Sequence, residues 1–357
     1  MSKYIEPLMI GCSKFYRGKG VISLLAAEIK RLGGKALLIG GPSSVDRVWA
    51  LVEKDCSQAG VQVELVRHPG QCTRDSAKKY AAKALNEGFT VIVGVGGGKC
   101  IDQAKCTSVF ADLPVITVPT SIATCVASSM VAILYTAEGK CDGSENLKKE
   151  IDVCIADENV IATAPARLLA SGMLDSMAKL PEVLQKVEGM DPADIDVIQT
   201  IQISNSKDIY AFLAKNAVEL YDQGQASPKF GDVVVTNLIQ TSLVSGFAAG
   251  SGQLAIAHGV YNNMRSYFTE QARPYLHGEM VAVGVLVQMH FNGSSLKEID
   301  DLRAMMQRLN MPSCLREIGF QPTEENMSLM CKLLAQDTKV TDPQRVQAIR
   351  AALDYAV

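Results

Sequence analysis

The first 157 residues alternate short apolar runs, rich in β-branched side chains, with longer segments of helical periodicity. The runs that predict strands are 35–41, 61–68, 90–98, 114–120, 130–136 and 152–157. Helical segments 44–60 and 73–88 join the first three runs, and each ends in glycine, a common signal for a helix C-terminus. This alternation predicts a doubly wound, mostly parallel α/β sheet. Ligands bind such sheets beyond the carboxyl ends of the strands, here the loops after Gly41, Gly98 and Thr120.

The alternation ends near residue 160. Thr163 and Pro165 form a helix-start signal, and the chain from there to Val357 has helical periodicity broken by prolines and glycines. A length of 357 residues also predicts about two domains. We therefore expect an α/β domain over 1–160 and an all-helical domain over 161–357.

Charge and cysteine usage narrow the class of protein. Thirty-five basic side chains face 38 acidic ones, with no basic stripe, so nucleic acid is a poor candidate partner. Lys3, Glu6 and Pro7 interrupt any apolar run that could form a signal-peptide core, which favours the cytoplasm. The 10 cysteines include no C-x-x-C pair and are expected to be reduced thiols.

One uncharged stretch, residues 233–257, is long enough to cross a bilayer. It contains many serine, threonine, asparagine and glutamine residues as well as glycines, which leave too little apolar surface for contact with lipid. Small residues at this density predict a buried helix packed closely against its neighbours rather than a membrane span.

A glycine-rich turn lies within residues 91–105, VIVGVGGGKCIDQAK. The Walker and Rossmann motifs both fail here, the second because Lys99 stands where its last glycine belongs. Glycines nevertheless let backbone N–H groups approach a phosphate, and a helix N-terminus adds partial positive charge. The segment therefore predicts either a phosphate site, to which Lys99 would add charge, or only a tight turn with Asp102 as a favourable first-turn carboxylate.

Two of the 4 histidines, His258 and His277, each precede a glycine, and the helical half also contains Asp175 in SGMLDSMAK. Two imidazoles and a carboxylate form a common catalytic zinc site that leaves one position open. The long separation of Asp175 from the histidines is no local ligand spacing, so ordinary core or surface positions remain the stronger interpretation from spacing alone.

Six segments in order resemble the glycerol dehydrogenase branch of the iron-containing alcohol dehydrogenase superfamily: GGGKCIDQAK, PVITVPTSIATC, AILYT, SGMLDSMAK, IAHGVYN and PYLHGEMVAVG. Their joint occurrence, rather than any one of them, is specific to the family. The resemblance implies the fold shared with dehydroquinate synthase, with an NAD(P)-binding domain over 1–160, a metal-binding helical domain over 161–357 and an active site in the cleft between them.

The resemblance also implies the site residues. Asp175, His258 and His277 would bind a divalent metal, Zn²⁺ first, with Fe²⁺ or Mn²⁺ as alternatives. The residues implied to contact NAD or NADP are Gly96, Gly97, Gly98, Lys99, Asp102, Thr120, Ser129, Val131 and Tyr135. In the implied reaction, the metal polarises a substrate hydroxyl while the nicotinamide accepts hydride, and carbonyl reduction is the reverse.

Two positions near the implied substrate depart from the family pattern. Glycerol dehydrogenases carry an acid where this chain has Cys125, which is either a small packing residue, the favoured interpretation, or a substrate contact. The iron-binding branch has a ligand histidine where this chain has Lys179, four residues after Asp175. On a continuous helix these two positions share a face, so Lys179 either pairs with Asp175 or faces a substrate carboxylate. Such a lysine would also weaken metal binding if buried.

A third departure concerns the cofactor. NAD-preferring relatives have an acid after the first strand, which would repel a 2′-phosphate, whereas this chain has Gly41 and Pro42. Either use of NADP alongside NAD or a preference for NADPH is therefore expected.

The sequence thus predicts a metal-dependent, NAD(P)-linked oxidoreductase for a small hydroxy compound. Cys125 and Lys179 resemble the hydroxycarboxylate dehydrogenase-like members, so a 2-hydroxy or 2-oxo acid is placed ahead of glycerol. A dehydroquinate synthase-like lyase and a non-catalytic nucleotide-binding relative are the further alternatives. The expected partners are the small-molecule substrate and further copies of the chain, without nucleic acid or membrane.

Overall fold

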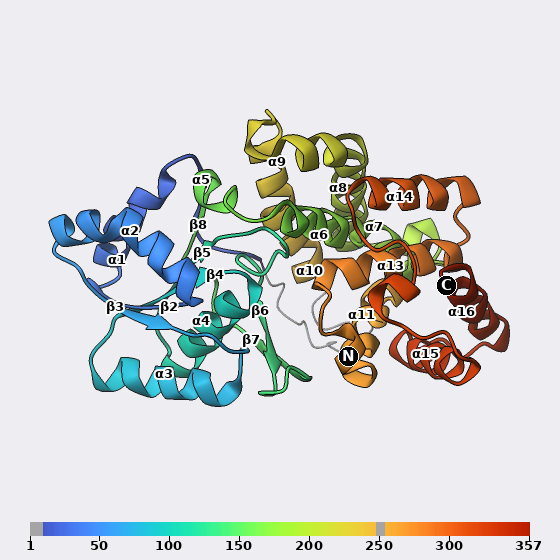
Figure 1. Cartoon of the computed structure of the whole chain (residues 1–357), viewed down its shortest axis with the longest axis horizontal. Helices are drawn as coiled ribbons and strands as arrows, with labels where there is room; N and C mark the ends of the chain where they lie inside the picture. The colour runs from blue at the N-terminus through green and yellow to red at the C-terminus, as the bar shows by residue number, and fades with distance from the viewer. Residues whose placement is uncertain (1–9, 248–253) are drawn as a thin grey trace. The chain divides into compact units, whose positions relative to one another are not determined.

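The structure, a computed structural model, describes residues 10–247 and 254–357. It divides into two compact units, shown in Figure 1. The α/β unit contains residues 10–165 and 224–246, and the helical unit contains 166–223 and the described residues from 247 onward. The two units thus part at Pro165, and residues 224–246, expected in the helical domain, group with the α/β unit. Arg17 explains this grouping in part, because its guanidinium lies near both Glu158 and Asp232.

A six-stranded parallel sheet forms the centre of the α/β unit, in the order β1-β8-β5-β4-β2-β3. The strands are β1 (Phe15–Gly18), β2 (Lys35–Gly40), β3 (Gln62–Arg67), β4 (Val91–Gly96), β5 (Val115–Pro119) and β8 (Val153–Asp157). Strands β4, β5 and β8 are buried along their whole length, as expected of parallel strands covered on both faces. The predicted doubly wound, mostly parallel sheet is confirmed.

Helices cover both faces of this sheet. The α-helices of the unit are α1 (Leu25–Arg31), α2 (Pro42–Ala59), α3 (Arg74–Asn86), α4 (Gly98–Ala111), α5 (Glu158–Ile161), α9 (Phe230–Val235) and α10 (Thr241–Phe247). One apolar core joins α1 and α2 to the sheet, and a second joins α3 and α4 to it. Chain order reverses between β2 and β4, so the loops after these two strands lie at the topological switch point.

The strand predicted over residues 130–136 forms, but it lies outside the six-stranded parallel sheet. These residues contain β6 (Val131–Tyr135), which pairs antiparallel with β7 (Cys141–Asn146) in a separate two-stranded sheet. Alternate residues of β6 are buried, as in a strand with one covered face, and β6 packs against α4.

The helical unit contains no strand among its described residues. Its α-helices are α6 (Ala166–Met177), α7 (Lys179–Lys186), α8 (Val197–Gln223), α11 (Ile256–Tyr267), α12 (Thr269–Ala272), α13 (His277–Phe291), α14 (Leu296–Arg308), α15 (Glu324–Asp337) and α16 (Pro343–Tyr355). Helix α13 is buried on nearly every side and packs against α6, α11, α14 and α16. Between Met280 and Val287 it is apolar all round, as expected of a central helix.

The uncharged stretch at 233–257 forms, where it is described, the end of α9, a π-helical turn at Thr236–Gln240, α10 and the start of α11. Residues 248–253 lie outside the described part. Among the described residues, no helix is both long and apolar enough to cross a membrane. All 10 cysteines lie among the described residues, and none of them forms a disulfide.

Candidate metal centre and nucleotide-binding turn

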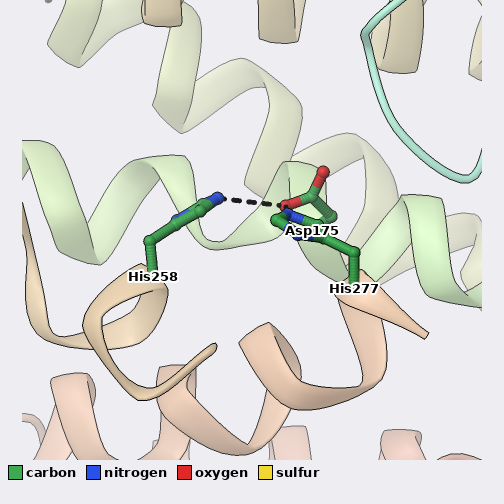
Figure 2. Close-up of side chains that lie close together, drawn as sticks. All are labelled: Asp175, His258 and His277. Carbon is green, nitrogen blue, oxygen red and sulfur yellow. Dashed lines mark hydrogen bonds and ion pairs between the residues drawn. The ribbon is translucent and has the colours of Figure 1, made fainter. Parts of the chain in front are cut away.

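Asp175, His258 and His277 come together in the helical unit, each from a different helix (Figure 2). Asp175 lies near the end of α6 and is buried, His258 lies in the first turn of α11, and His277 begins α13. Their candidate ligand atoms all lie within 4.8 Å of one another, and among the described residues no other group of His, Cys, Asp or Glu meets this geometry. Three helices therefore place these residues at one point.

A close helix crossing sets the positions of Asp175 and His277. Gly278 follows His277, and a Cβ on Gly278 would lie 2.0 Å from the carbonyl oxygen of Ser171, one turn before Asp175. Only glycine allows the backbones of α6 and α13 to approach this closely. The glycine of this His-Gly pair is therefore required by packing, and it brings the carboxylate and the imidazole together.

An ion pair between the exposed Arg167 and the buried Glu279 also ties α6 to the start of α13. Arg167 donates from Nε to Glu279 Oε1 over 2.6 Å and from Nη2 to Glu279 Oε2 over 2.7 Å. The same Oε2 accepts the backbone N–H of Leu276 at 2.8 Å, which caps α13 just before His277. A bidentate pair of this kind fixes the relative orientation of the two side chains as well as strengthening their interaction. Neither Arg167 nor Glu279 was identified from the sequence.

The donor atoms fit a small divalent ion. Asp175 Oδ1 lies 3.3 Å from His258 Nε2 and 3.1 Å from His277 Nε2. In a tetrahedral zinc site with bonds of about 2.0–2.1 Å, neighbouring donor atoms lie roughly 3.3 Å apart. Two imidazoles and one carboxylate also leave a fourth position for a substrate oxygen. The residues present are therefore compatible with Zn²⁺, Fe²⁺ or Mn²⁺, and the ligand types do not select among them.

Glu182, which the sequence analysis missed, orients His258. Its Oε1 lies 2.6 Å from His258 Nδ1 and accepts the backbone N–H of the same residue at 3.0 Å. If Nδ1 carries the proton toward Glu182, the lone pair of Nε2 faces Asp175 and is available to an ion. The only signal for it in the sequence is its spacing of two helical turns from Asp175, which any surface acid could also show.

The two carboxylates are held in their ionised form. Burial alone would raise the pKa of Asp175, but His277 and His258, with Lys179, hold it well below its usual range. Burial likewise opposes ionisation of Glu182, while His258 and Lys179 lower its pKa. Burial by itself would lower the pKa of His258, and the nearby Glu182 carboxylate outweighs it and raises that pKa. Asp175 is thus kept in the anionic form that binds a cation, and Glu182 adds a second negative charge beside it.

Lys179 does not share an unbroken helix with Asp175. Helix α6 ends at Met177 and α7 begins at Lys179, with Ala178 in a turn. Pro181 explains the break, because it has no N–H to donate to the carbonyl of Met177. Lys179 Nζ lies 3.9 Å from Glu182 Oε2, and its side chain is 12% exposed. Its positive charge therefore acts on both carboxylates of the centre.

The glycine-rich turn lies at the topological switch point of the α/β unit. Gly96 ends β4 with a φ of 138°, and Gly97 caps α4, whose first residue is Gly98. Cβ atoms built on these three glycines would lie within 3.7 Å of the hydroxyls of Ser44, Ser121 and Thr124. The first N–H groups of α4 have no partner inside the helix. This surface of glycine backbone and neutral hydroxyls suits a phosphate, and the three hydroxyls were not identified from the sequence.

The other predicted nucleotide residues lie near this turn or on the segment that follows β5. Thr120 donates its backbone N–H to Gly96 at 3.0 Å. Lys99 Nζ lies 5.8 Å from the ring centre of Tyr135 on β6. Ser129 and Val131 follow in the segment that also contains Cys125, whose side chain is neither fully buried nor fully exposed. Their roles toward a nucleotide or a substrate stay predictions.

Asp102 differs from these residues. It is only 4% exposed, its Oδ1 lies 3.0 Å from Lys105 Nζ, and its Oδ2 accepts the N–H of Ile133 at 3.2 Å. Burial raises the pKa of its carboxyl, while Lys105 opposes that shift. Its side chain thus ties α4 to β6 inside the unit, and its expected contact with the cofactor stays a prediction.

Comparisons with known proteins agree with this architecture. A family model described as "Iron-containing alcohol dehydrogenase" matches residues 12–158. A glycerol dehydrogenase from Thermotoga maritima is 28% identical over 314 residues, covering 86% of this chain and 83% of that protein. Hydroxycarboxylate dehydrogenase A from Escherichia coli is 28% identical over 256 residues, covering 70% and 68%.

A solved structure is also similar. The crystal structure of a probable glycerol dehydrogenase from Sinorhizobium meliloti aligns with a TM-score of 0.83, covering 97% of this chain and 96% of that one. At 23% identity, this match shows a shared fold alone.

Proposed function

Because the chain belongs to the iron-containing alcohol dehydrogenase superfamily, on its glycerol dehydrogenase-like branch, we propose that it is a metal-dependent, NAD(P)-linked oxidoreductase. It would interconvert a small hydroxy compound and its carbonyl form. The observation that carries the proposal is the convergence of Asp175, His258 and His277, whose donor atoms lie within 4.8 Å of one another.

In this proposal the helical unit binds the metal and the α/β unit binds the nucleotide. In the helical unit, Asp175, His258 and His277 would hold a divalent ion, and such an ion supplies Lewis acidity toward a hydroxyl or carbonyl oxygen. In the α/β unit, the turn at Gly96–Gly98 would hold the pyrophosphate of a nicotinamide nucleotide, which supplies the hydride chemistry. The chain itself contributes position and charge.

Replacement of Asp175 by alanine tests this assignment. We expect Asp175→Ala to lose zinc binding and all measurable turnover, while its Kd for NADPH stays within about twofold of the wild-type value. The measurements are zinc content after dialysis, NADPH fluorescence titration, and NAD(P)H oxidation with a panel of oxo acids, ketones and polyols. Asp301→Ala is the matched control, because Asp301 is an exposed aspartate of the same unit that pairs with Lys297.

Wild-type turnover by metal-free Asp175→Ala would contradict the proposal. Release of phosphate without net oxidation of NAD(P)H would instead favour a dehydroquinate synthase-like lyase. Stoichiometric nucleotide without bound metal or turnover in the wild-type protein would favour a non-catalytic relative.

We propose a 2-hydroxy or 2-oxo acid as the substrate, on the basis of charge. The carboxylates of Asp175 and Glu182 balance the two charges of a divalent ion, and Lys179 leaves the group net positive. A net positive centre favours an anionic substrate. The similarity to hydroxycarboxylate dehydrogenase A supports the same class. The similarity to glycerol dehydrogenases supports the alternative, glycerol or another polyol.

Lys179→Met separates these two substrate classes. We expect it to raise KM for a 2-oxo acid by about tenfold or more, and to change KM for a neutral ketone or glycerol by less than about twofold, because only the acid carries a charge for Lys179 to attract. Lys207→Met on the exposed face of α8 is the control. Equal effects on charged and neutral substrates would refute a role for Lys179 in selecting the substrate.

We further propose that the chain accepts NADP as well as NAD. Strand β2 ends at Gly40, and the first turn of α2 after it contains no acidic residue. A carboxylate that would repel a 2′-phosphate is therefore missing at this place.

A further inference from the structure

Lys105 is a fully buried cation whose contacts all lie within the α/β unit. It stands on α4, two turns after the glycine turn, and its side chain is 0% exposed. Placing an ammonium away from water is strongly unfavourable unless its protons are all bonded. A lysine at such a position therefore points to a specific set of acceptors.

These acceptors are backbone carbonyls of the irregular segment before β6 and of Val131, the first residue of β6. Lys105 Nζ donates to the carbonyl oxygens of Val126, Ser129 and Val131 over 2.9, 3.0 and 2.6 Å. An ammonium has three protons, so each proton has an acceptor in this segment. Asp102 Oδ1 lies 3.0 Å away on the helical side and supplies the opposite charge.

The segment held in this way joins β5 to β6 and has no helix or strand of its own between residues 121 and 130. Besides Lys105, Thr117 Oγ1 holds the carbonyl of Ala127 at 2.7 Å, and Asn237 Nδ2 holds that of Ile122 at 3.0 Å. Thr117 and Asn237 each bind one of these carbonyls, whereas Lys105 binds three. Its removal would take a donor from three carbonyls at once, of which that of Val131 would keep only the Ser129 hydroxyl at 3.3 Å among the described side-chain donors.

We propose that Lys105 is a positioning residue for nucleotide binding, acting through the segment 120–131. This inference rests on the proposed function, because it uses the assignment of Thr120, Ser129 and Val131 to the nucleotide. Lys105 itself has no contact with the ligand. It holds the backbone that presents those residues at the carboxyl end of β5.

The test is removal of the ammonium followed by chemical rescue. We expect Lys105→Ala to weaken NADPH and NADH binding by about tenfold or more, measured by fluorescence titration, while the zinc affinity stays within about twofold. Added n-propylammonium, which matches the missing end of the side chain, is expected to restore most of the nucleotide affinity. Neutral n-propanol fills the same volume but offers one donor, and is expected to restore little.

Ile29→Ala is the matched control for lost packing, because Ile29 is equally buried on α1 of the same unit. It should lower the melting temperature without a comparable loss of nucleotide affinity. If Lys105→Ala is too unstable to purify, Lys105→Met, which keeps the volume, replaces it in the binding titrations.

The outcomes separate this inference from the proposed function. A wild-type protein that binds neither NADH nor NADPH would contradict the proposed function. A wild-type protein that binds both, beside a Lys105 variant of unchanged affinity, would overturn the positioning role alone. Equal losses in Ile29→Ala, or equal rescue by propanol, would show that Lys105 contributes only to packing.

Discussion

The Glu182 carboxylate fixes the ring of His258 through two contacts, one to Nδ1 and one to the backbone N–H. A histidine ligand held in this way keeps one tautomer and one ring orientation, which raises its affinity for a metal. The same acid also lies 3.9 Å from Lys179. Glu182 thus contacts both Lys179, which departs from the family pattern, and His258, one of the predicted metal ligands.

Glu182→Gln tests this connection, because the amide keeps an acceptor atom but loses the charge. We expect the affinity for Zn²⁺ to fall by roughly 10- to 100-fold, measured by competition with a chromophoric chelator. NADPH affinity should be unchanged, since the nucleotide residues lie in the α/β unit. Glu188→Gln is the control, because Glu188 is a more exposed acid of the same unit that pairs with Arg345. Equal zinc affinities in both variants would show that Glu182 has no part in the centre.

At the scale of elements, strands with strong apolar runs could be predicted from the sequence. The runs at 35–41, 61–68 and 114–120 correspond to β2, β3 and β5 with ends differing by at most one residue. Strands β1 and β7 were missed because Phe15–Gly18 is only four residues long and Cys141–Asn146 is mostly polar and exposed. Whether β6 joins the parallel sheet or a hairpin depends on β7, which carries no apolar signal.

The candidate metal centre could not be predicted from spacing, because it depends on how α6, α11 and α13 pack. The approach of Gly278 to Ser171 and the Arg167–Glu279 pair are contacts between distant segments. The resemblance to a family supplied the three ligand positions. It did not supply Glu182, or the break before Lys179 that Pro181 causes. It also did not reveal that Asp102 lies beside the buried Lys105, since a carboxylate in the first turns of a helix looks the same in sequence whether it faces a ligand or a buried lysine.

At the scale of the whole molecule, the two proposed ligands use different units. The metal ligands belong to residues 166–223 and 254–357, while the glycine turn and the segment held by Lys105 belong to 10–165. A ligand that binds only the folded protein stabilises it by about 2.7 kcal/mol at 100 times its Kd. That stabilisation slows local opening first where the ligand makes its contacts.

Hydrogen exchange should therefore report the two ligands in different places. We expect Zn²⁺ added to chelator-treated protein to slow amide exchange in α6, α11 and α13, because it joins residues of these three helices. NADPH should slow exchange in α4 and in residues 120–131, where the first N–H groups of α4 and the irregular segment are proposed to meet the nucleotide. Asp175→Ala serves as the control, since it should lose the zinc effect and keep the NADPH effect. Protection of α4 by zinc with no change in α6, α11 and α13 would contradict the assigned metal centre, even if zinc activates the enzyme.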